Sequence, residues 1–169
     1  MKSNKTEDNK WPVRILFVCL GNICRSPAAQ GIFEKKLKER NLSDKFIVDS
    51  AGLYSGHAGE LPDKRMRIHA AQRGYTLDHR SRPVGTTDFD HYDVIVAMDN
   101  NNYARLKNMA PTLEDEHKIV KMIDFIDGFP RYDHVPDPYY EGSEGFELVL
   151  NMLEEGTEQM IEYFTRNDD

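Results

Sequence analysis

The sequence predicts an α/β fold in which a parallel sheet is covered by helices. Three observations predict it. Short apolar segments alternate with longer helix-forming ones along the chain, the order typical of βαβ units. The first apolar segment, residues 13–18, is nearly all apolar and rich in branched residues, as in a strand covered on both faces. The loop CLGNICRSP follows that segment directly and leads into a helix.

The first half of the chain is predicted to form two strands and two helices. The first helix is expected to begin at Ser26, whose hydroxyl can cap it, and to run to about residue 40. The segment FIVDSAG, residues 46–52, predicts the second strand. After a loop, Asp63 can cap the next helix and Gly74 is expected to end it.

The second half is predicted to add two strands and two helices. DVIVAMD (93–99) and KIVKMI (118–123) are expected to be buried strands, with a helical segment at about 100–109 between them. Residues 124–142 form a Pro-, Gly- and aromatic-rich segment without periodicity, and long loops of this kind are often functional. The last helix has apolar residues at spacings of three and four, which predicts a face docked on the sheet.

Length and composition predict one domain, and the lack of a membrane-spanning or secretory segment predicts a cytoplasmic location. The chain has 169 residues and 39% hydrophobic residues, which suits a single core at residues 11–169 after a disordered tail at residues 1–10. No segment has the ~20 apolar residues of a membrane-spanning helix, and the N-terminus lacks the apolar core of a secretory signal. The net charge of −7 argues against nucleic-acid binding.

One segment is locally basic. Residues 63–82 hold a series of cations, which we interpret as a solvated helix and loop rather than as a docking patch: Lys64, Arg65, Arg67, Arg73, Arg80 and Arg82.

The loop after the first strand has the features of an anion-binding site with a nucleophile. Five residues separate Cys19 from Arg25, and such a turn can direct several backbone N–H groups into one concavity at a helix N-terminus. Gly21 allows a positive φ or a close approach, and Asn22 tolerates a left-handed backbone. The same donors would stabilise a thiolate at Cys19, and the Arg25 guanidinium can hold two oxygens of a phosphoryl group. The pattern favours phosphoryl transfer to sulfur.

A proton donor for the leaving group is expected on the long loop. In HVPDPYYEG, Asp137 lies between two prolines, which restrict the backbone and can present its carboxyl group toward a site. Taken alone, this pattern is also that of an ordinary Asp-Pro turn.

The stretch VCLGNICRSP and the distal DPYY resemble the low-molecular-weight protein-tyrosine phosphatase family, from about residue 13 to residue 164. The resemblance implies a three-layer sandwich with a four-stranded parallel sheet flanked by helices and a phosphate-binding loop after the first strand. It also implies an enzyme that hydrolyses protein phosphotyrosine through a phosphocysteine intermediate. By this resemblance Cys19 is the nucleophile, Arg25 binds the phosphate and Asp137 is the general acid and then the general base.

Other positions receive roles from the same resemblance. The phosphate-binding loop comprises Leu20, Gly21, Asn22, Ile23, Cys24 and Ser26, and Ser50 and His79 support it. Cys24 matches a loop cysteine that can pair with the nucleophile on oxidation, which would make the site redox-sensitive; it could equally be a small buried hydrophobe.

The wall of the substrate slot departs from the family pattern. Members often carry an aromatic residue on the loop after the second strand, and Gly56 stands at the position we align with it. Either Tyr54 or His57 supplies this wall, or the slot is more open. Tyr139 and Tyr140 could form the opposite wall, or they could pack against the edge of the sheet.

Two other functions remain as alternatives. A protein-arginine phosphatase of the same fold typically has Thr after the loop Asn, and Ile23 at that position favours phosphotyrosine. A non-catalytic phosphopeptide-binding module would be expected to lack the nucleophile, the arginine or the acid, and all three are present. An arsenate reductase of related fold needs further cysteines, and this chain has none after Cys24.

The expected partners are tyrosine-phosphorylated proteins, among them a bacterial tyrosine kinase by analogy with bacterial members. No nucleic acid, membrane or cofactor is expected. A metal site is not expected either, because Cys19 and Cys24 share one short loop and no nearby histidine completes a zinc-binding spacing.

Overall fold

Four parallel strands form the centre of the computed structural model, which describes residues 10–139 and 142–166. The strands lie in the order β2-β1-β3-β4, and they are β1 (Val13–Cys19), β2 (Phe46–Gly52), β3 (Val94–Ala97) and β4 (Ile119–Lys121). In the register of the sheet Cys19 pairs with Gly52 and Val18 pairs with Ala97. The carboxyl ends of β1, β2 and β3 therefore meet at one edge, where parallel sheets bind their ligands.

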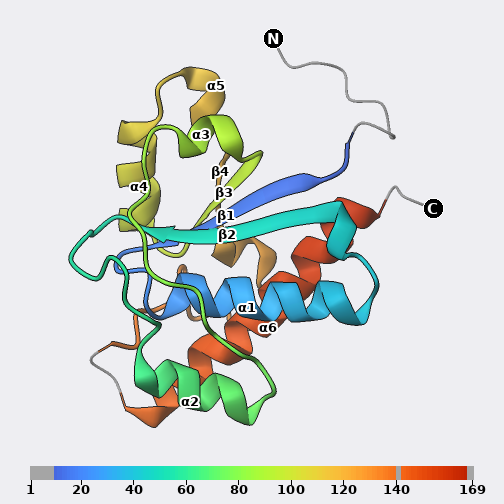
Figure 1. Ribbon diagram of the computed structural model, residues 1–169, viewed down its shortest axis with the longest axis vertical. Helices are drawn as coiled ribbons and strands as arrows, with labels where there is room; N and C mark the ends of the chain where they lie inside the picture. Colours follow the sequence, from blue (N-terminus) through green and yellow to red (C-terminus); the bar gives the residue numbers. More distant parts are fainter. Residues whose placement is uncertain (1–9, 140–141, 167–169) are drawn as a thin grey trace.

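Helices cover both faces of this sheet, giving three layers (Figure 1). One face carries α1 (Arg25–Glu39), α2 (Lys64–Gln72) and α6 (Ser143–Thr165), whose apolar side chains form one buried cluster with Ile15 and Phe17 of β1. The other face carries α3 (Asp88–His91) and α4 (Asn100–Met109), which pack on Leu16 and Val18. Successive residues of β1 thus point into two cores, which explains why its sequence is apolar without alternation.

The remaining elements are short. They are the 3₁₀ turns η2 (Ser43–Lys45) and η3 (Met122–Phe125) and the single helical turn α5 (Leu113–Glu116). The fourth strand is shorter than the expected 118–123, because the chain turns into η3 after Lys121. Between η3 and residue 139 the chain forms only turns and irregular backbone, as the absence of periodicity indicated.

Helix boundaries follow the capping signals with one exception. Asp63 caps α2 by accepting a hydrogen bond from the Arg65 backbone N–H, and Gly74 follows the helix in the left-handed region with φ 88°. The expectation that Ser26 caps α1 is wrong: α1 begins at Arg25 after Cys24, and no side chain caps it. The Ser26 hydroxyl is instead bonded within the loop that precedes the helix.

No helix in the described part of the chain is long and apolar enough to cross a bilayer. The disordered tail expected for residues 1–10 lies, except for Lys10, outside the described residues.

Candidate active site

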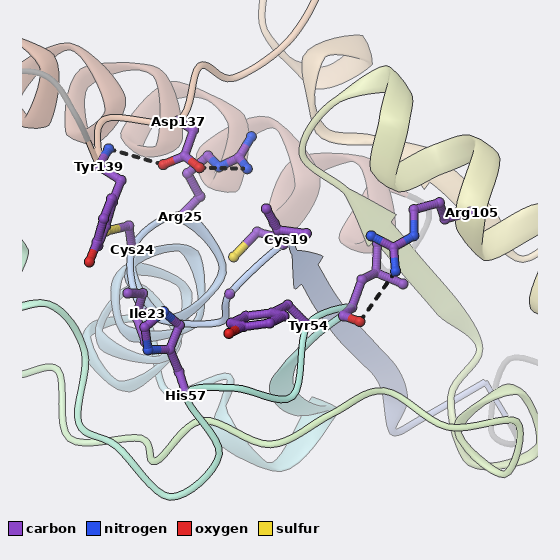
Figure 2. Close-up of a pocket in the computed structure, with 12 residues that line it drawn as sticks. Cys19, Ile23, Cys24, Arg25, Tyr54, His57, Arg105, Asp137 and Tyr139 are labelled. Atoms are coloured by element: carbon purple, nitrogen blue, oxygen red, sulfur yellow. Dashed lines mark hydrogen bonds and ion pairs between the residues drawn. The ribbon is translucent and has the colours of Figure 1, made fainter.

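A cavity of about 430 Å³ opens at the carboxyl end of β1 (Figure 2). Ten of the residues singled out from the sequence line it: Cys19, Leu20, Gly21, Ile23, Cys24, Arg25, Tyr54, His57, Asp137 and Tyr139. They come from four places in the chain, namely β1, the loop and start of α1, the loop after β2, and the long segment before α6. The fold therefore gathers the predicted nucleophile, arginine and acid around one space.

The Cys19 thiol lies at the floor of this cavity and faces two backbone N–H donors and a hydroxyl. The Asn22 and Ser26 backbone N–H groups lie 3.3 and 3.4 Å from Sγ, and the Ser26 hydroxyl lies 3.0 Å from it. Cys19 is 2% exposed. These groups direct partial positive charge at the sulfur.

Asn22 holds the loop in its shape. Its backbone is left-handed with φ 56°, and its side chain is fully buried. The side-chain N–H groups donate to the hydroxyls of Ser26 at 2.8 Å and Ser50 at 3.0 Å, while Oδ1 accepts from the Arg82 backbone N–H at 3.0 Å. One asparagine thus connects the loop to α1, to β2 and to the segment after α2, and so keeps the donors around Cys19 in place.

Ser50 and His79 take the supporting positions expected of them. The Ser50 hydroxyl accepts from Asn22 and donates to Gln30 Oε1 at 2.7 Å, and Nε2 of His79 lies 3.2 Å from Asn22 Oδ1. Burial lowers the pKa of His79 below its ordinary value, and the Arg82 cation acts in the same direction against the raising effect of Asp49. A neutral imidazole therefore stands beside the asparagine at neutral pH.

Arg25 is buried at the first position of α1 and is held by two acceptors. Its Nη1 donates to Asp99 Oδ2 at 2.8 Å and to the Val135 carbonyl at 2.9 Å, and Nη2 lies 3.6 Å from Asp137 Oδ2. Burial on its own would lower the pKa of Arg25, but the negative charges of Cys19, Asp99 and Asp137 outweigh it and raise that pKa. A permanent cation with a fixed orientation therefore stands between the thiol and the acid.

The segment that carries Asp137, called the acid segment below, is held in place through backbone contacts. Asp137 is 43% exposed at the cavity, and its Oδ1 accepts from the Tyr139 backbone N–H at 3.0 Å. Arg65 of α2 donates to the Tyr139 carbonyl at 2.8 Å and is itself held by Asp63 at 2.9 Å. The Asp137 carboxyl group is therefore positioned by its own turn and by an arginine from another element.

Three rings surround the mouth of the slot. The rings of Tyr54 and His57 lie edge to face at 5.6 Å, and those of His57 and Tyr139 are tilted at 6.4 Å (Figure 2). A Cβ at Gly56 would lie 2.1 Å from the Tyr54 ring, so the Tyr54 side chain folds over that glycine. Tyr54 and His57 thus line the cavity beside the position that we aligned with the aromatic wall. Tyr140 lies outside the described residues.

Cys24 lies in the same loop and lines the cavity as a free thiol, as Cys19 does. Burial raises the pKa of the Cys24 thiol strongly, and the nearby charges of Asp63, Cys19 and Asp137 add to this. Cys24 is therefore a neutral thiol in the same loop as Cys19.

Sequence reasoning missed Asp99 and Arg105. Asp99 ends the apolar run of the third strand at the same edge of the sheet as Cys19, and a charged residue directly after a buried strand was the signal that could have found it. Arg105 lies at the cavity mouth on α4, with Nη2 3.4 Å from the Leu53 carbonyl. Nothing in its local sequence distinguishes it from other exposed helix cations.

Comparisons with known proteins agree with this geometry. A family model described as low molecular weight phosphotyrosine protein phosphatase matches residues 14–169. The chain is 37% identical to a low molecular weight protein-tyrosine-phosphatase of Bacillus subtilis, over 88% of this chain and 94% of that protein. It is similar to a crystal structure of a protein tyrosine phosphatase from Entamoeba histolytica, with TM-score 0.88, 44% identity and coverage of 93% of this chain and 99% of that one. It is also similar to the crystal structure of a Drosophila arginine phosphatase, with TM-score 0.82, 35% identity and coverage of 89% and 96%.

Proposed function

The chain belongs to the low molecular weight protein-tyrosine phosphatase family, and on this premise we propose which of its residues carry out the hydrolysis of phosphotyrosine. It is a hydrolase that acts on phosphotyrosine in phosphoproteins. The observation that carries the assignment is the convergence of a donor-surrounded thiol, a buried guanidinium and an exposed carboxyl group on one cavity: Cys19, Arg25 and Asp137.

Substrate binding uses the loop and the rings. The loop from Leu20 to Ser26 accepts the phosphoryl oxygens on its backbone N–H groups, assisted by the N-terminus of α1. Arg25 supplies Nη2 to the equatorial oxygens while Asp99 and the Val135 carbonyl hold Nη1. The rings of Tyr54, His57 and Tyr139 flank the substrate ring at the mouth of the slot.

In the first step the Cys19 thiolate attacks phosphorus and the bond from phosphorus to the tyrosine oxygen breaks. The electron pair stays on that oxygen, and Asp137 gives it a proton, so that neutral tyrosine leaves. Charge that accumulates on the three equatorial oxygens is met by Arg25 and by the loop donors.

In the second step water hydrolyses the phosphocysteine. Asp137, now a carboxylate, takes a proton from the water as its oxygen attacks phosphorus. The S–P bond breaks, the thiolate returns to its place beside Asn22 and Ser26, and phosphate leaves. Asp137 ends the cycle protonated, as it began.

Replacement of the two reacting side chains tests this assignment. Cys19→Ser should abolish the hydrolysis of an aryl phosphate, and Asp137→Asn should slow it by a factor of about 10²–10⁴, the contribution usual for a general acid. Asp133→Asn is the matched control, because the Asp133 carboxylate lies on the same segment but pairs with His134. Full activity of Cys19→Ser would mean that the loop only cradles an anion and that the protein is a phosphopeptide-binding module.

Arginine phosphatase activity is the second candidate, favoured by the 35% identity to a Drosophila arginine phosphatase. Ile23, which replaces the threonine expected for such an enzyme, lines the cavity and supports phosphotyrosine. Rates on phosphoarginine and phosphotyrosine peptides of the same sequence decide between them, and we expect the phosphotyrosine peptide to be cleaved faster.

Redox sensitivity is a further part of the proposal. Oxidation of Cys19 by a peroxide gives a sulfenic acid, and the Cys24 thiol can displace its oxygen as water to form a disulfide. The placement of both thiols in one loop and the neutral state of Cys24 support this order of events. Reduction by a dithiol would restore the enzyme.

We also propose that residues 11–169 form one phosphatase domain that works in the cytoplasm on tyrosine-phosphorylated proteins, with a bacterial tyrosine kinase among them. The two buried clusters on the faces of one sheet support the single domain. The kinase rests on analogy with bacterial members of the family.

A further inference from the structure

A second cavity adjoins the slot on its α2 side. It has a volume of about 440 Å³ and shares Ile23, His57 and Tyr139 with the first cavity. Figure 2 shows these three residues on the side of the slot opposite Arg105. A peptide whose phosphotyrosine occupies the slot can therefore continue past them into the second cavity.

This second cavity is lined by three cations, and we call it the basic groove. Lys64 and Arg67 come from α2, and Arg80 comes from the segment after it. Arg67 donates to the Pro62 carbonyl at 2.9 Å, and Arg80 to the Gly59 carbonyl at 2.9 Å. Among residues 10–139 and 142–166, none of the three cations forms an ion pair with a carboxylate.

Other arginines of the same region are paired. Arg65 pairs with Asp63, Arg73 with Glu147 and Glu154, and Arg82 with Asp49 and Asp88. Within the part of the chain that the structure describes, the groove cations therefore differ from their neighbours in having no carboxylate partner, although the chain carries 29 acidic residues against 22 basic ones.

The two carboxylates at the groove are already engaged. Asp63 accepts from the backbone and side chain of Arg65, and burial, which raises its pKa, is outweighed by these hydrogen bonds, so that its pKa lies below the ordinary value. Glu60 lies 3.1 Å from Nδ1 of His57. Among the described residues that line the groove, the charge left for an occupant is positive.

We propose that the basic groove binds acidic side chains close to the phosphotyrosine, so that the enzyme prefers phosphotyrosine in an acidic sequence context. This inference rests on the proposed function, because it is the slot that places the substrate chain beside the groove. The segment that the sequence led us to interpret as a merely solvated helix and loop is then a docking surface for the substrate.

The test compares two phosphotyrosine peptides of equal length, one with Asp and Glu on both sides of the phosphotyrosine and one with Asn and Gln. The wild type should have a higher kcat/KM for the acidic peptide, by about 1.5- to 5-fold for each exposed ion pair that forms. The preference should weaken as salt rises to about 0.5 M, because salt screens charges at the surface.

Variants of the groove cations test whether the preference for the acidic peptide arises in the basic groove. Lys64→Gln with Arg67→Gln should bring the ratio of the two kcat/KM values close to one, and Lys64→Glu, which changes the charge of the groove by the same amount, should lower the ratio to a similar extent. A glutamate in the first turn of α2 suits the helix dipole, so this variant should fold. Lys38→Gln, which removes an exposed cation of α1, is the control with the same change in charge as Lys64→Gln and should keep the preference.

The outcomes separate the two proposals. Equal cleavage of both peptides by the wild type, or an unchanged preference in the Lys64 and Arg67 variants, would overturn the groove inference and leave phosphotyrosine hydrolysis intact. An equal loss of preference in Lys38→Gln would mean that the preference is a general effect of net charge. This outcome would also overturn the groove inference. Failure of the wild type to cleave either peptide or an aryl phosphate would instead contradict the proposed function.

Discussion

Asn22 shapes the loop around Cys19 through both its backbone conformation and its side-chain hydrogen bonds. A left-handed backbone turns the loop so that its N–H group faces Cys19 Sγ, and the side chain joins Ser26, Ser50 and the Arg82 backbone. Asparagine tolerates this backbone better than most residues with a Cβ. The hydrogen bonds around the Cys19 thiol therefore depend on Asn22.

Asn41 offers a matched control for this residue, because it is the other non-glycine with a left-handed backbone in the described chain, at φ 57°. Asn22→Ala and Asn41→Ala both place alanine in that strained region, but only the first also leaves buried partners unpaired. We expect Asn22→Ala to lower the free energy of unfolding by about 1–3 kcal/mol more than Asn41→Ala does. Urea unfolding followed by the fluorescence of the single tryptophan, Trp11, measures both. Equal losses would mean that the side-chain network adds nothing to the backbone effect.

At the scale of elements, the acid segment depends on α2. Arg65 bonds the Tyr139 carbonyl, and its guanidinium lies 5.4 Å from the Tyr139 ring and 4.9 Å from the Phe146 ring. The Tyr139 backbone in turn donates to Asp137. The Asp137 carboxyl group, which we propose as the proton donor, is thereby connected to α2.

Arg65→Met tests this connection. It should reduce kcat by up to about 10²-fold for a phenyl phosphate, a loss of the size that misplacement of a catalytic group can cause. The reduction should be smaller for a nitrophenyl phosphate, whose leaving group needs less protonation. Arg65→Lys should recover part of the activity.

Arg73→Met is the control for this variant, because Arg73 also joins α2 to another helix, through Glu147 and Glu154 of α6, and lies outside the cavity. It should affect stability without changing the dependence on the leaving group. The positioning role of Arg65 would be refuted by a loss that is the same for both substrates, or by the same pattern in Arg73→Met.

The strands and helices could be predicted because their signals are local. The apolar runs of β1 and β3, the segment FIVDSAG of β2 and the signals at Asp63 and Gly74 are read from neighbouring residues. The error at Ser26 arose where a hydroxyl that suits a helix cap is used by Cys19 and Asn22 instead. The Arg25–Asp99 and Arg65–Tyr139 contacts each join residues 74 positions apart, and no local pattern reports such a pairing.

At the scale of the whole molecule, the reactive groups lie at one edge of a sheet that is covered on both faces. The apolar layers on both faces bury β1 and so fix the position of Cys19 at the carboxyl end of this strand. The other side chains that line the cavity come mainly from loops, which is where proteins usually carry their functional residues. The resemblance of the loop and of the distal DPYY motif predicted the family, and the family model and relatives confirm it. The roles of the individual residues remain a proposal.

The central claim is that phosphate passes through Cys19. The phosphocysteine intermediate should accumulate when Asp137→Asn reacts with a nitrophenyl phosphate. The nitrophenolate is a good leaving group and departs without help from an acid. Hydrolysis of the phosphocysteine is slow because the variant lacks the base that activates water. Rapid acid quenching followed by mass spectrometry of the peptides is the most direct measurement. We expect one phosphate, located on Cys19 and absent from the protein with Cys19→Ser. Product release without any phosphoenzyme, or phosphate on another residue, would contradict the account.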